Sequence, residues 1–293
     1  MVDKYRQALN ENTFNLSDGA VTEKVKKIIT EKSEKNNTVE VLRKIYSCID
    51  LTTLNTTDTR EDIWQFTDKV NKFEGSNPLI NNVAAICVFP NLVKTVKESL
   101  TADVRIASVC GGFPSSQTFL EVKIAETALA VSDGAEEIDI VLNLGLFLND
   151  DIKELCEEID EIKETCHGAK LKVILETGAL ETSEKINNAS VLSLYSGADF
   201  LKTSTGKVYP GATLEAAYVM CSAIKQYHKK TGIRKGIKIS GGVSTVQDAV
   251  NYYTIVKEVL GEEWLDIGLF RIGASRLANQ LLSEILNEDV KFF

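Results

Sequence analysis

The sequence predicts an α/β protein built as one (β/α)8 TIM barrel with an N-terminal helical extension. Two observations support this prediction. From about residue 45, short apolar segments rich in Val and Ile alternate with amphipathic helical segments eight times, which is typical of a parallel sheet covered by helices. The apolar segments show little alternation of polar and apolar residues, as expected for strands buried on both faces. Eight such units close naturally into a barrel.

The chain of 293 residues contains no low-complexity linker, so it is interpreted as one large domain with an appended region. Residues 1–44 form the predicted extension and residues 45–293 the barrel. Apolar residues at helical spacing predict a helix over 21–29 and another over 38–46. A flexible leader is the alternative interpretation of this region.

The strands and helices are placed by apolar runs, hydroxyl caps and terminal glycines. The predicted strands cover residues 47–52, 84–89, 105–110, 137–142, 171–176, 199–204, 236–240 and 266–272. The predicted helices cover residues 57–73, 91–100, 115–134, 151–164, 182–197, 213–230, 245–261 and 274–286. An open doubly wound sheet is the alternative architecture. It would need a phosphate loop of the type G-x-G-x-x-G or G-x-x-x-x-G-K-[ST], and the sequence contains neither.

Composition limits the classes of partner. The formal net charge of −9 disfavours nucleic acid and anionic membrane surfaces as partners. The longest apolar run, residues 83–89, is far too short to cross a bilayer. Six scattered cysteines, only two histidines and a charged N-terminus indicate a reduced cytoplasmic protein with no metal site. A homodimer or a higher homo-oligomer is compatible with the sequence, which does not specify the state.

Two lysines lie in predicted strands whose other residues are mostly apolar and are expected to be buried in the core. In a (β/α)8 barrel the active site lies at the carboxyl ends of the strands. Lys202 lies in ADFLKTSTG and Lys238 in GIKISGG. If both face the same barrel mouth, each is expected to lower the pKa of the other, with burial adding to the effect. The resulting neutral amine is what Schiff-base chemistry requires. The structural alternative is that each lysine is only paired to a carboxylate at the barrel rim.

Two aspartates are candidates for the same site. Asp139 lies between isoleucines in EIDIVLN, so its carboxyl group must be paired or titrating. Beside two amines it is expected to stay ionised and to move protons through a water; the alternative is a pure salt-bridge role. Asp50 in CIDLTTLN is interpreted as a supporting residue or a contact to a substrate hydroxyl rather than as the proton carrier.

Loops rich in small residues follow the last three strands and form a candidate phosphate site. Barrels frequently bind phosphate after strands 7 and 8, through backbone N–H groups and a helix N-terminus. Other polar residues near strand ends are Asn143, Glu176, Ser240 and Arg271. The candidate binding residues are Thr203, Ser204, Gly206 and Lys207 after strand 6, Gly241 and Gly242 after strand 7, and Gly273 and Ser275 after strand 8, with Arg276 nearby. Thr52 and Cys87 complete the set as candidate lining residues.

Eight strings of the chain resemble the deoxyribose-phosphate aldolase family over roughly residues 40–285. They occur in the family's order and are DLTTLN (50–55), AAICVFP (84–90), GGFPSSQT (111–118), EIDIVLN (137–143), KVILETG (172–178), GADFLKTSTGK (197–207), KISGGV (238–243) and FRIGAS (270–275). The sixth string is the most specific. Ser244 stands where members of the family often carry arginine or asparagine.

The resemblance implies a class I aldolase that reversibly cleaves 2-deoxy-D-ribose 5-phosphate to D-glyceraldehyde 3-phosphate and acetaldehyde. It implies that Lys202 forms the Schiff base, that Asp139 and Lys238 transfer protons, with Lys238 also tuning the pKa, and that no metal or organic cofactor takes part. It also implies a role in nucleoside breakdown. Two alternatives stay open: a lysine-dependent aldolase with a different acceptor aldehyde, and a silent barrel that serves as a binding scaffold.

Overall fold

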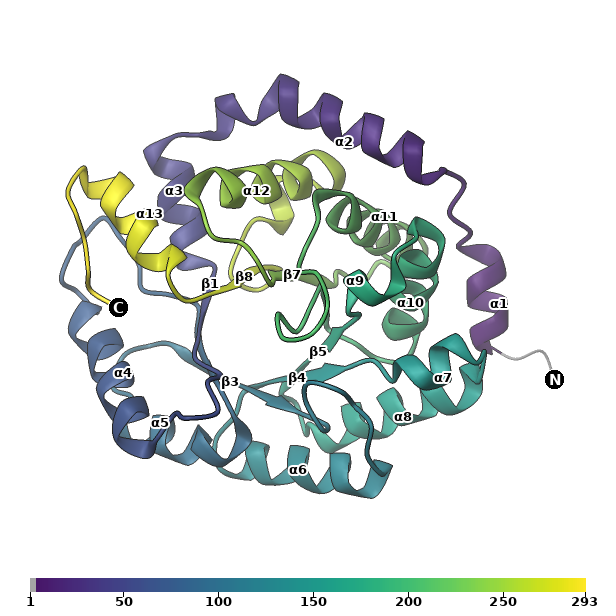
Figure 1. The fold of residues 1–293 in the computed structure, drawn as a ribbon, viewed down its shortest axis with the longest axis horizontal. Coiled ribbons are helices and arrows are strands. Elements are labelled where there is room, and N and C mark those ends of the chain that lie inside the picture. The colour runs from purple at the N-terminus through teal and green to yellow at the C-terminus, as the bar shows by residue number, and fades with distance from the viewer. Residues whose placement is uncertain (1–3) are drawn as a thin grey trace.

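The computed structural model describes residues 4–293, which contain a closed barrel of eight parallel strands in the order β1 to β8 (Figure 1). This confirms the predicted fold class. Each strand pairs with its sequence neighbours, and β1 pairs with β8 to close the ring. The strands are β1 Ile49–Thr52, β2 Ala85–Val88, β3 Arg105–Cys110, β4 Glu137–Val141, β5 Lys170–Ile174, β6 Phe200–Lys202, β7 Gly236–Ser240 and β8 Phe270–Ala274.

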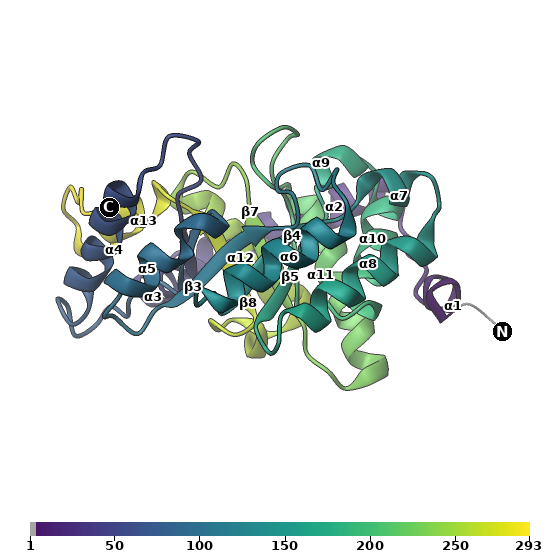
Figure 2. The same cartoon turned by 90° about the horizontal axis from the view of Figure 1, so that it is seen from below.

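Helices surround the strands as an outer layer. They are α4 Arg60–Phe73, α5 Val93–Ser99, α6 Leu120–Ser132, α7 Leu144–Leu148, α8 Ile152–Thr165, α9 Thr177–Leu180, α10 Ser183–Tyr195, α11 Leu214–Thr231, α12 Val246–Leu260 and α13 Leu277–Leu286, with short 3-10 turns at Pro90–Leu92 and Glu262–Trp264. Thr59 and Thr245 begin α4 and α12 with capping boxes. In the side view the loop after β6 rises on the same side as α7 and α9, at the carboxyl ends of the strands (Figure 2).

Between residue 4 and β1 the chain forms three α-helices and one 3-10 turn. They are α1 Lys4–Glu11, α2 Asp18–Lys32, the turn Glu34–Asn36 and α3 Val39–Ser47. Helix α2 runs outside α11 and α12 and buries Val21 and Val25 against them (Figure 1). Helix α1 packs on α8 and α10, and α3 packs on α12 and α13. The predicted helices at 21–29 and 38–46 are present, and the proposed boundary at residue 45 falls inside α3.

Several element boundaries differ from the prediction. The last strand was predicted over 266–272, but Asp266 forms a turn instead, accepting hydrogen bonds from the N–H groups of Gly268 and Phe270. The strand therefore begins at Phe270. The helix predicted from residue 115 begins at Leu120, because the preceding segment folds as a turn in which Ser116 has φ 61°.

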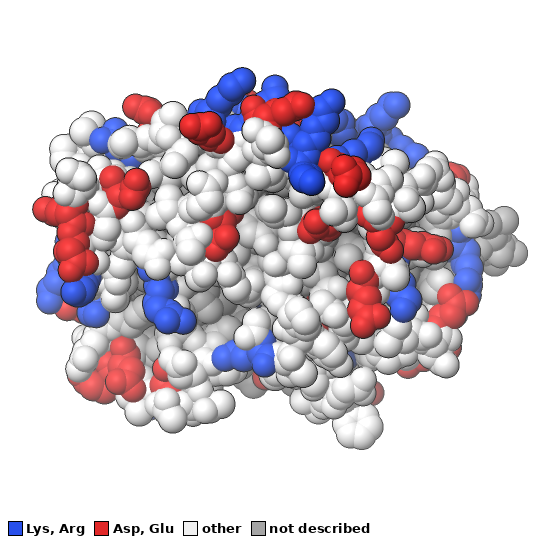
Figure 3. All heavy atoms as spheres, turned by 45° about the horizontal axis from the view of Figure 1, so that its top comes forward, with Lys and Arg blue, Asp and Glu red and all other residues white. Residues whose placement is uncertain are grey.

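The surface carries both signs of charge. On the face drawn in Figure 3, Lys and Arg side chains gather along the upper edge with several Asp and Glu among them, and both signs of charge recur over the rest. Among residues 4–293, no helix combines the length and the apolar character needed to cross a bilayer.

Candidate active site

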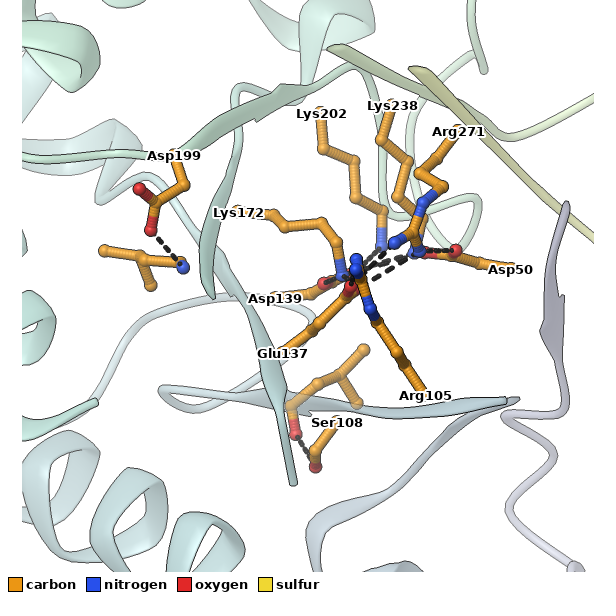
Figure 4. Close-up of polar contacts among 12 residues, drawn as sticks. Asp50, Arg105, Ser108, Glu137, Asp139, Lys172, Asp199, Lys202, Lys238 and Arg271 are labelled. Atoms are coloured by element: carbon orange, nitrogen blue, oxygen red, sulfur yellow. Dashed lines mark hydrogen bonds and ion pairs between the residues drawn. The ribbon is translucent and has the colours of Figure 1, made fainter. Parts of the chain in front are cut away.

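Strand register brings the candidate residues together inside the barrel. Lys202 on β6 is the register partner of Lys238 on β7. Lys172 on β5 is the partner of Asp139 on β4. Because side chains in a strand alternate between faces, register partners in neighbouring strands point to the same side of the sheet. All four side chains therefore point into the barrel interior, where they meet (Figure 4).

The carboxylate of Asp139 lies at the centre of this group. Its Oδ2 atom accepts hydrogen bonds from the Nζ atoms of Lys202 and Lys238, both at 2.8 Å. Its Oδ1 atom accepts from Nζ of Lys172 at 2.7 Å. Asp139 is fully buried, whereas Lys202 is 4% exposed and Lys238 1%. The three residues predicted to do chemistry are thus in direct contact, and Lys202 is the one nearest to solvent.

A second layer of ion pairs lies below, toward the amino ends of the strands. Lys172 Nζ also contacts Glu137 Oε2 at 2.6 Å, and Lys238 Nζ contacts Asp50 Oδ2 at 2.6 Å. Arg271 joins both acids, with Nη1 at 2.5 Å from Asp50 Oδ1 and Nη2 at 2.7 Å from Glu137 Oε1. These seven side chains, all nearly or fully buried, are called the core network below (Figure 4).

The network shifts the pKa of each member in a direction set by its neighbours. Burial lowers the pKa of Lys202, and Lys238 lowers it further against the opposing pull of Asp139. Burial alone would raise the pKa of Asp139, but Lys172, Lys202 and Lys238 together hold it well below its usual value. The lowered pKa favours the ionised form of the Asp139 carboxyl group.

The pKa of Lys238 differs from the expectation that two lysines would lower each other's values. Burial does lower it, but Asp139 and Asp50 outweigh burial and raise the pKa of Lys238 above its ordinary value. Lys238 contacts two carboxylates, whereas Lys202 contacts only one. Of the two lysines, only Lys202 therefore has a lowered pKa, and the raised pKa of Lys238 favours its ammonium form.

A cavity of about 460 Å³ opens at the carboxyl ends of the strands beside the network. Gly273 lies between the cavity and the core network. It lines the cavity, and a Cβ atom at this position would lie 3.1 Å from Cε of Lys238. Of the residues predicted to bind substrate, seven line this cavity: Thr52, Gly206, Lys207, Gly241, Gly242, Gly273 and Ser275. Ser244 and Arg276 line it as well.

Four other predicted binding residues do not line this cavity. Asp50 belongs to the core network, and Cys87 is a fully buried thiol whose pKa burial raises. Thr203 exchanges hydrogen bonds with the backbone of Ser240, so it ties β6 to β7. Ser204 is buried, and its carbonyl accepts from the Ser240 hydroxyl. These residues support the walls of the site from behind.

Two polar residues near strand ends, Glu176 and Lys207, anchor the loop that follows β6. Glu176, with φ 54°, points its carboxylate at Thr205, accepting from its N–H at 3.1 Å and from its hydroxyl at 2.5 Å. Lys207, from the same loop, reaches the β1 loop, where its amine donates to the carbonyl of Leu54 at 2.5 Å. The β6 loop is thus fixed on both sides of the barrel mouth. Asn143 caps α7 instead.

Glu137 and Lys172 were missed by the sequence analysis, and Arg271 was placed too near the barrel mouth. The prediction considered polar residues at the carboxyl ends of strands, whereas Glu137 is the first residue of β4 and Arg271 is the second residue of β8. One signal was available: Glu137 lies two positions before Asp139, so it points to the same face of the strand. Among residues 4–293, no three His, Cys, Asp or Glu side chains are grouped to hold a metal ion.

Comparisons with known proteins identify the family of this chain. Residues 44–275 match the model of the DeoC/LacD family of aldolases. A relative from Caenorhabditis elegans is 40% identical over 289 residues, and this alignment covers 96% of this chain and 95% of the relative. The deoxyribose-phosphate aldolase of Bos taurus is 40% identical over 83% of this chain and 80% of its own. A solved structure of an Aeropyrum pernix deoxyribose phosphate aldolase, described as tetrameric, has a TM-score of 0.66 at 26% identity and covers 87% of this chain and 96% of its own. The chain belongs to the DeoC/LacD family of aldolases.

Proposed function

We propose that the enzyme reversibly cleaves 2-deoxy-D-ribose 5-phosphate to D-glyceraldehyde 3-phosphate and acetaldehyde through a Schiff base on Lys202. The observation that carries this proposal is a buried amine of lowered pKa beside a carboxylate and an ammonium group. An amine must be neutral to attack a carbonyl carbon. The family relationship and the relatives' names support the reaction type and the substrate.

The positions of the three residues support the following steps. The neutral amine of Lys202 attacks the aldehyde carbon of the open-chain sugar, and loss of water gives an iminium ion. A base removes the proton of the hydroxyl group on the third carbon, and the bond between the second and third carbons breaks. Glyceraldehyde 3-phosphate leaves, and the enamine that remains is protonated and hydrolysed to acetaldehyde. Asp139 accepts and returns protons through a water, while Lys238 keeps Asp139 ionised and donates.

The phosphate group fits the cavity near the start of α13. The N-terminus of α12 is already occupied by a carboxylate of the chain, because Asp248 accepts a hydrogen bond from the N–H of Thr245 at 3.1 Å. The N-terminus of α13 has no side-chain cap and no acidic residue in its first turn. Such an open helix start binds anions. A second cavity of about 270 Å³ is lined by Glu181 and Glu215, which disfavour a phosphate.

Arg276 is the cation expected to hold the phosphate. It is exposed, lines the cavity and has no hydrogen bond or ion pair among the described residues, while the amine of Lys207 is engaged with a carbonyl. We expect Arg276→Ala to lower kcat/KM for deoxyribose 5-phosphate by about 10-fold to 100-fold, the value of a hydrogen bond to a charged group. Arg276→Lys should restore part of the loss, because it keeps the charge but not the forked geometry.

The comparison substrate for this prediction is unphosphorylated deoxyribose, for which kcat/KM should change much less. Steady-state rates with both substrates measure the ratio. Equal losses for the two sugars would contradict a phosphate contact by Arg276. A native enzyme that shows no preference for the phosphorylated sugar would instead favour the alternative of a different acceptor aldehyde.

Borohydride trapping tests the covalent step directly. Reduction of the enzyme in the presence of acetaldehyde should attach an ethyl group to one lysine, because the iminium becomes a secondary amine. Mass mapping of peptides is expected to place the group on Lys202. An adduct on another lysine would refute the residue assignment, and the absence of any adduct would refute the Schiff-base mechanism.

The assembly and the compartment are also proposals. A homo-oligomer is supported by the tetrameric description of the Aeropyrum pernix relative and by three exposed apolar side chains near or on α6: Phe119 at 78%, Val122 at 50% and Leu129 at 67%. Sedimentation equilibrium measures the state, and a monomer would contradict the proposal. A cytoplasmic location, in nucleoside breakdown, is supported by six free cysteines, all buried; localisation of the tagged protein in cells would test it.

A further inference from the structure

The core network contains unequal numbers of acidic and basic groups. Its carboxylates are Asp50, Glu137 and Asp139, and its basic groups are Lys172, Lys202, Lys238 and Arg271. If every group were ionised, the barrel interior would hold one uncompensated positive charge. A buried charge without a partner is costly, and a titratable group normally becomes neutral instead.

Only one of the four basic groups can give up its proton at low cost. Arg271 contacts two carboxylates and is a guanidinium, which does not deprotonate in proteins. Lys172 lies within 2.7 Å of both Glu137 and Asp139, and Lys238 lies within 2.8 Å of Asp50 and Asp139. Lys202 has a single carboxylate partner, which it shares with two other lysines. Lys202 is therefore the group that is neutralised.

We infer that the pairing of Lys172 with Glu137, at the far end of the network from the cavity, sets the protonation state of Lys202 through the charge balance of the core. With Lys202 neutral, three positive and three negative charges remain. Lys172 and Glu137 are thus positioning residues: neither contacts Lys202, and both act through Asp139 and the total charge. The inference rests on the proposed role of Lys202 as a nucleophile.

Other groups around Lys202 do not change this count. The charged and titratable side chains that the other strands present are Asp50 on β1, Cys87 on β2, Arg105 on β3, Glu137 and Asp139 on β4, Lys170 and Lys172 on β5, Lys238 on β7 and Arg271 on β8. Lys170 is exposed, so water screens its charge. Cys87 stays a neutral thiol because burial raises its pKa. Arg105 contacts Glu137 at 3.2 Å, but its side chain is 40% exposed, so water screens its charge.

Single and paired substitutions separate charge balance from local contact. Lys172→Met removes one positive charge and should raise the apparent pKa of Lys202 by about 1 pH unit or more, the effect of a nearby charge. Glu137→Gln removes one negative charge and should lower it. The double variant Glu137→Gln/Lys172→Met removes one charge of each sign, so the pKa of Lys202 should return close to the native value. Lys229→Met, at an exposed position on α11, serves as the control for the loss of a lysine charge away from the network.

Competitive labelling with trace acetic anhydride measures the titration of Lys202, because only the neutral amine reacts. Labelled peptides are quantified by mass spectrometry over a range of pH, on the full chain and without substrate. The readout is therefore independent of turnover, and a failure of borohydride trapping would refute the proposed function without touching the charge balance.

Two results would overturn the inference. One is an unchanged pKa of Lys202 in Lys172→Met or in Glu137→Gln. The other is a pKa of Lys202 that is shifted as far in the double variant as in Lys172→Met. That result would show that Lys172 acts only by holding Asp139 in place. If Lys172→Met does not fold, Glu137→Gln, which nearly preserves the shape of the side chain, still tests the direction of the shift in the pKa of Lys202. The double variant then tests whether the two charge changes cancel.

Discussion

Replacing Lys202 by methionine should lower kcat for retro-aldol cleavage by about 10⁴-fold or more, because the covalent route through the Schiff base is lost. Methionine has a similar length and no amine. Rates are measured by following the release of glyceraldehyde 3-phosphate with a coupled dehydrogenase. Substantial remaining turnover would contradict the covalent role. Lys229→Met, at an exposed position on α11, is the control and should keep full activity.

The same substitution should leave the fold nearly as stable as before. On the charge balance inferred above, Lys202 is the neutral member of the core network, so its loss removes a hydrogen bond to Asp139 but no compensating charge. Asp139 keeps Lys172 and Lys238 as partners. We expect the free energy of unfolding to fall by no more than about 1 kcal/mol, the value of one hydrogen bond, because the variant no longer has to lose a lysine proton on folding. Urea unfolding of Lys202→Met measures this directly, and a much larger loss would indicate that Lys202 carries a charge in the native state.

Arg271→Met should have the opposite profile, with its main effect on stability. The guanidinium joins Asp50 to Glu137 and donates from Nε to the carbonyl of Ile267 at 2.6 Å. Its removal leaves two buried carboxylates short of partners, which typically costs about 3–5 kcal/mol. The lost positive charge should also raise the pKa of Lys202. Because the neutral amine forms as pH rises through that pKa, the rising limb of the activity profile should move to higher pH.

The control for Arg271→Met is a surface pair of the same type. Lys72 and Asp68 form an i,i+4 ion pair at 2.6 Å on α4, with side chains 70% and 47% exposed. Lys72→Met should change the free energy of unfolding by no more than about 0.5 kcal/mol, because solvent screens the pair. Urea unfolding compares the two variants. A loss below about 1 kcal/mol for Arg271→Met would show that the core tolerates Asp50 and Glu137 without it.

The barrel was predictable from the sequence because its periodic signals are local. Strand β7 was predicted with its observed bounds, since Gly236 and Ser240 enclose a short apolar run. The three-residue strand β6 was overestimated, because Thr203 and Ser204 remain buried although their backbone has left the ladder. The short helices α7 and α9 were missed, since a turn of four or five residues has no amphipathic period to detect.

The candidate site was predictable only in part. Lys202, Lys238 and Asp139 were predicted to share one site because each is a charge inside an apolar strand, and the structure brings them together. Lys172 sits one position after the start of its predicted strand, where a lysine usually faces solvent, so nothing local distinguished it from the exposed Lys170. Its partner Glu137 is 35 positions earlier in the chain, and only the register of β4 against β5 brings the two together.

The pairing of Asp50 with Arg271 spans 221 positions and joins the first strand to the last. During synthesis, Lys202 is made long before β8 and begins as an ordinary protonated lysine. The fourth positive charge of the core arrives only when β8 docks beside β1 and β7, and on the charge count above it is this arrival that deprotonates Lys202. On that count, Lys202 would react with aldehydes much more slowly in a nascent or broken barrel than in the closed ring, because only the neutral amine attacks a carbonyl carbon.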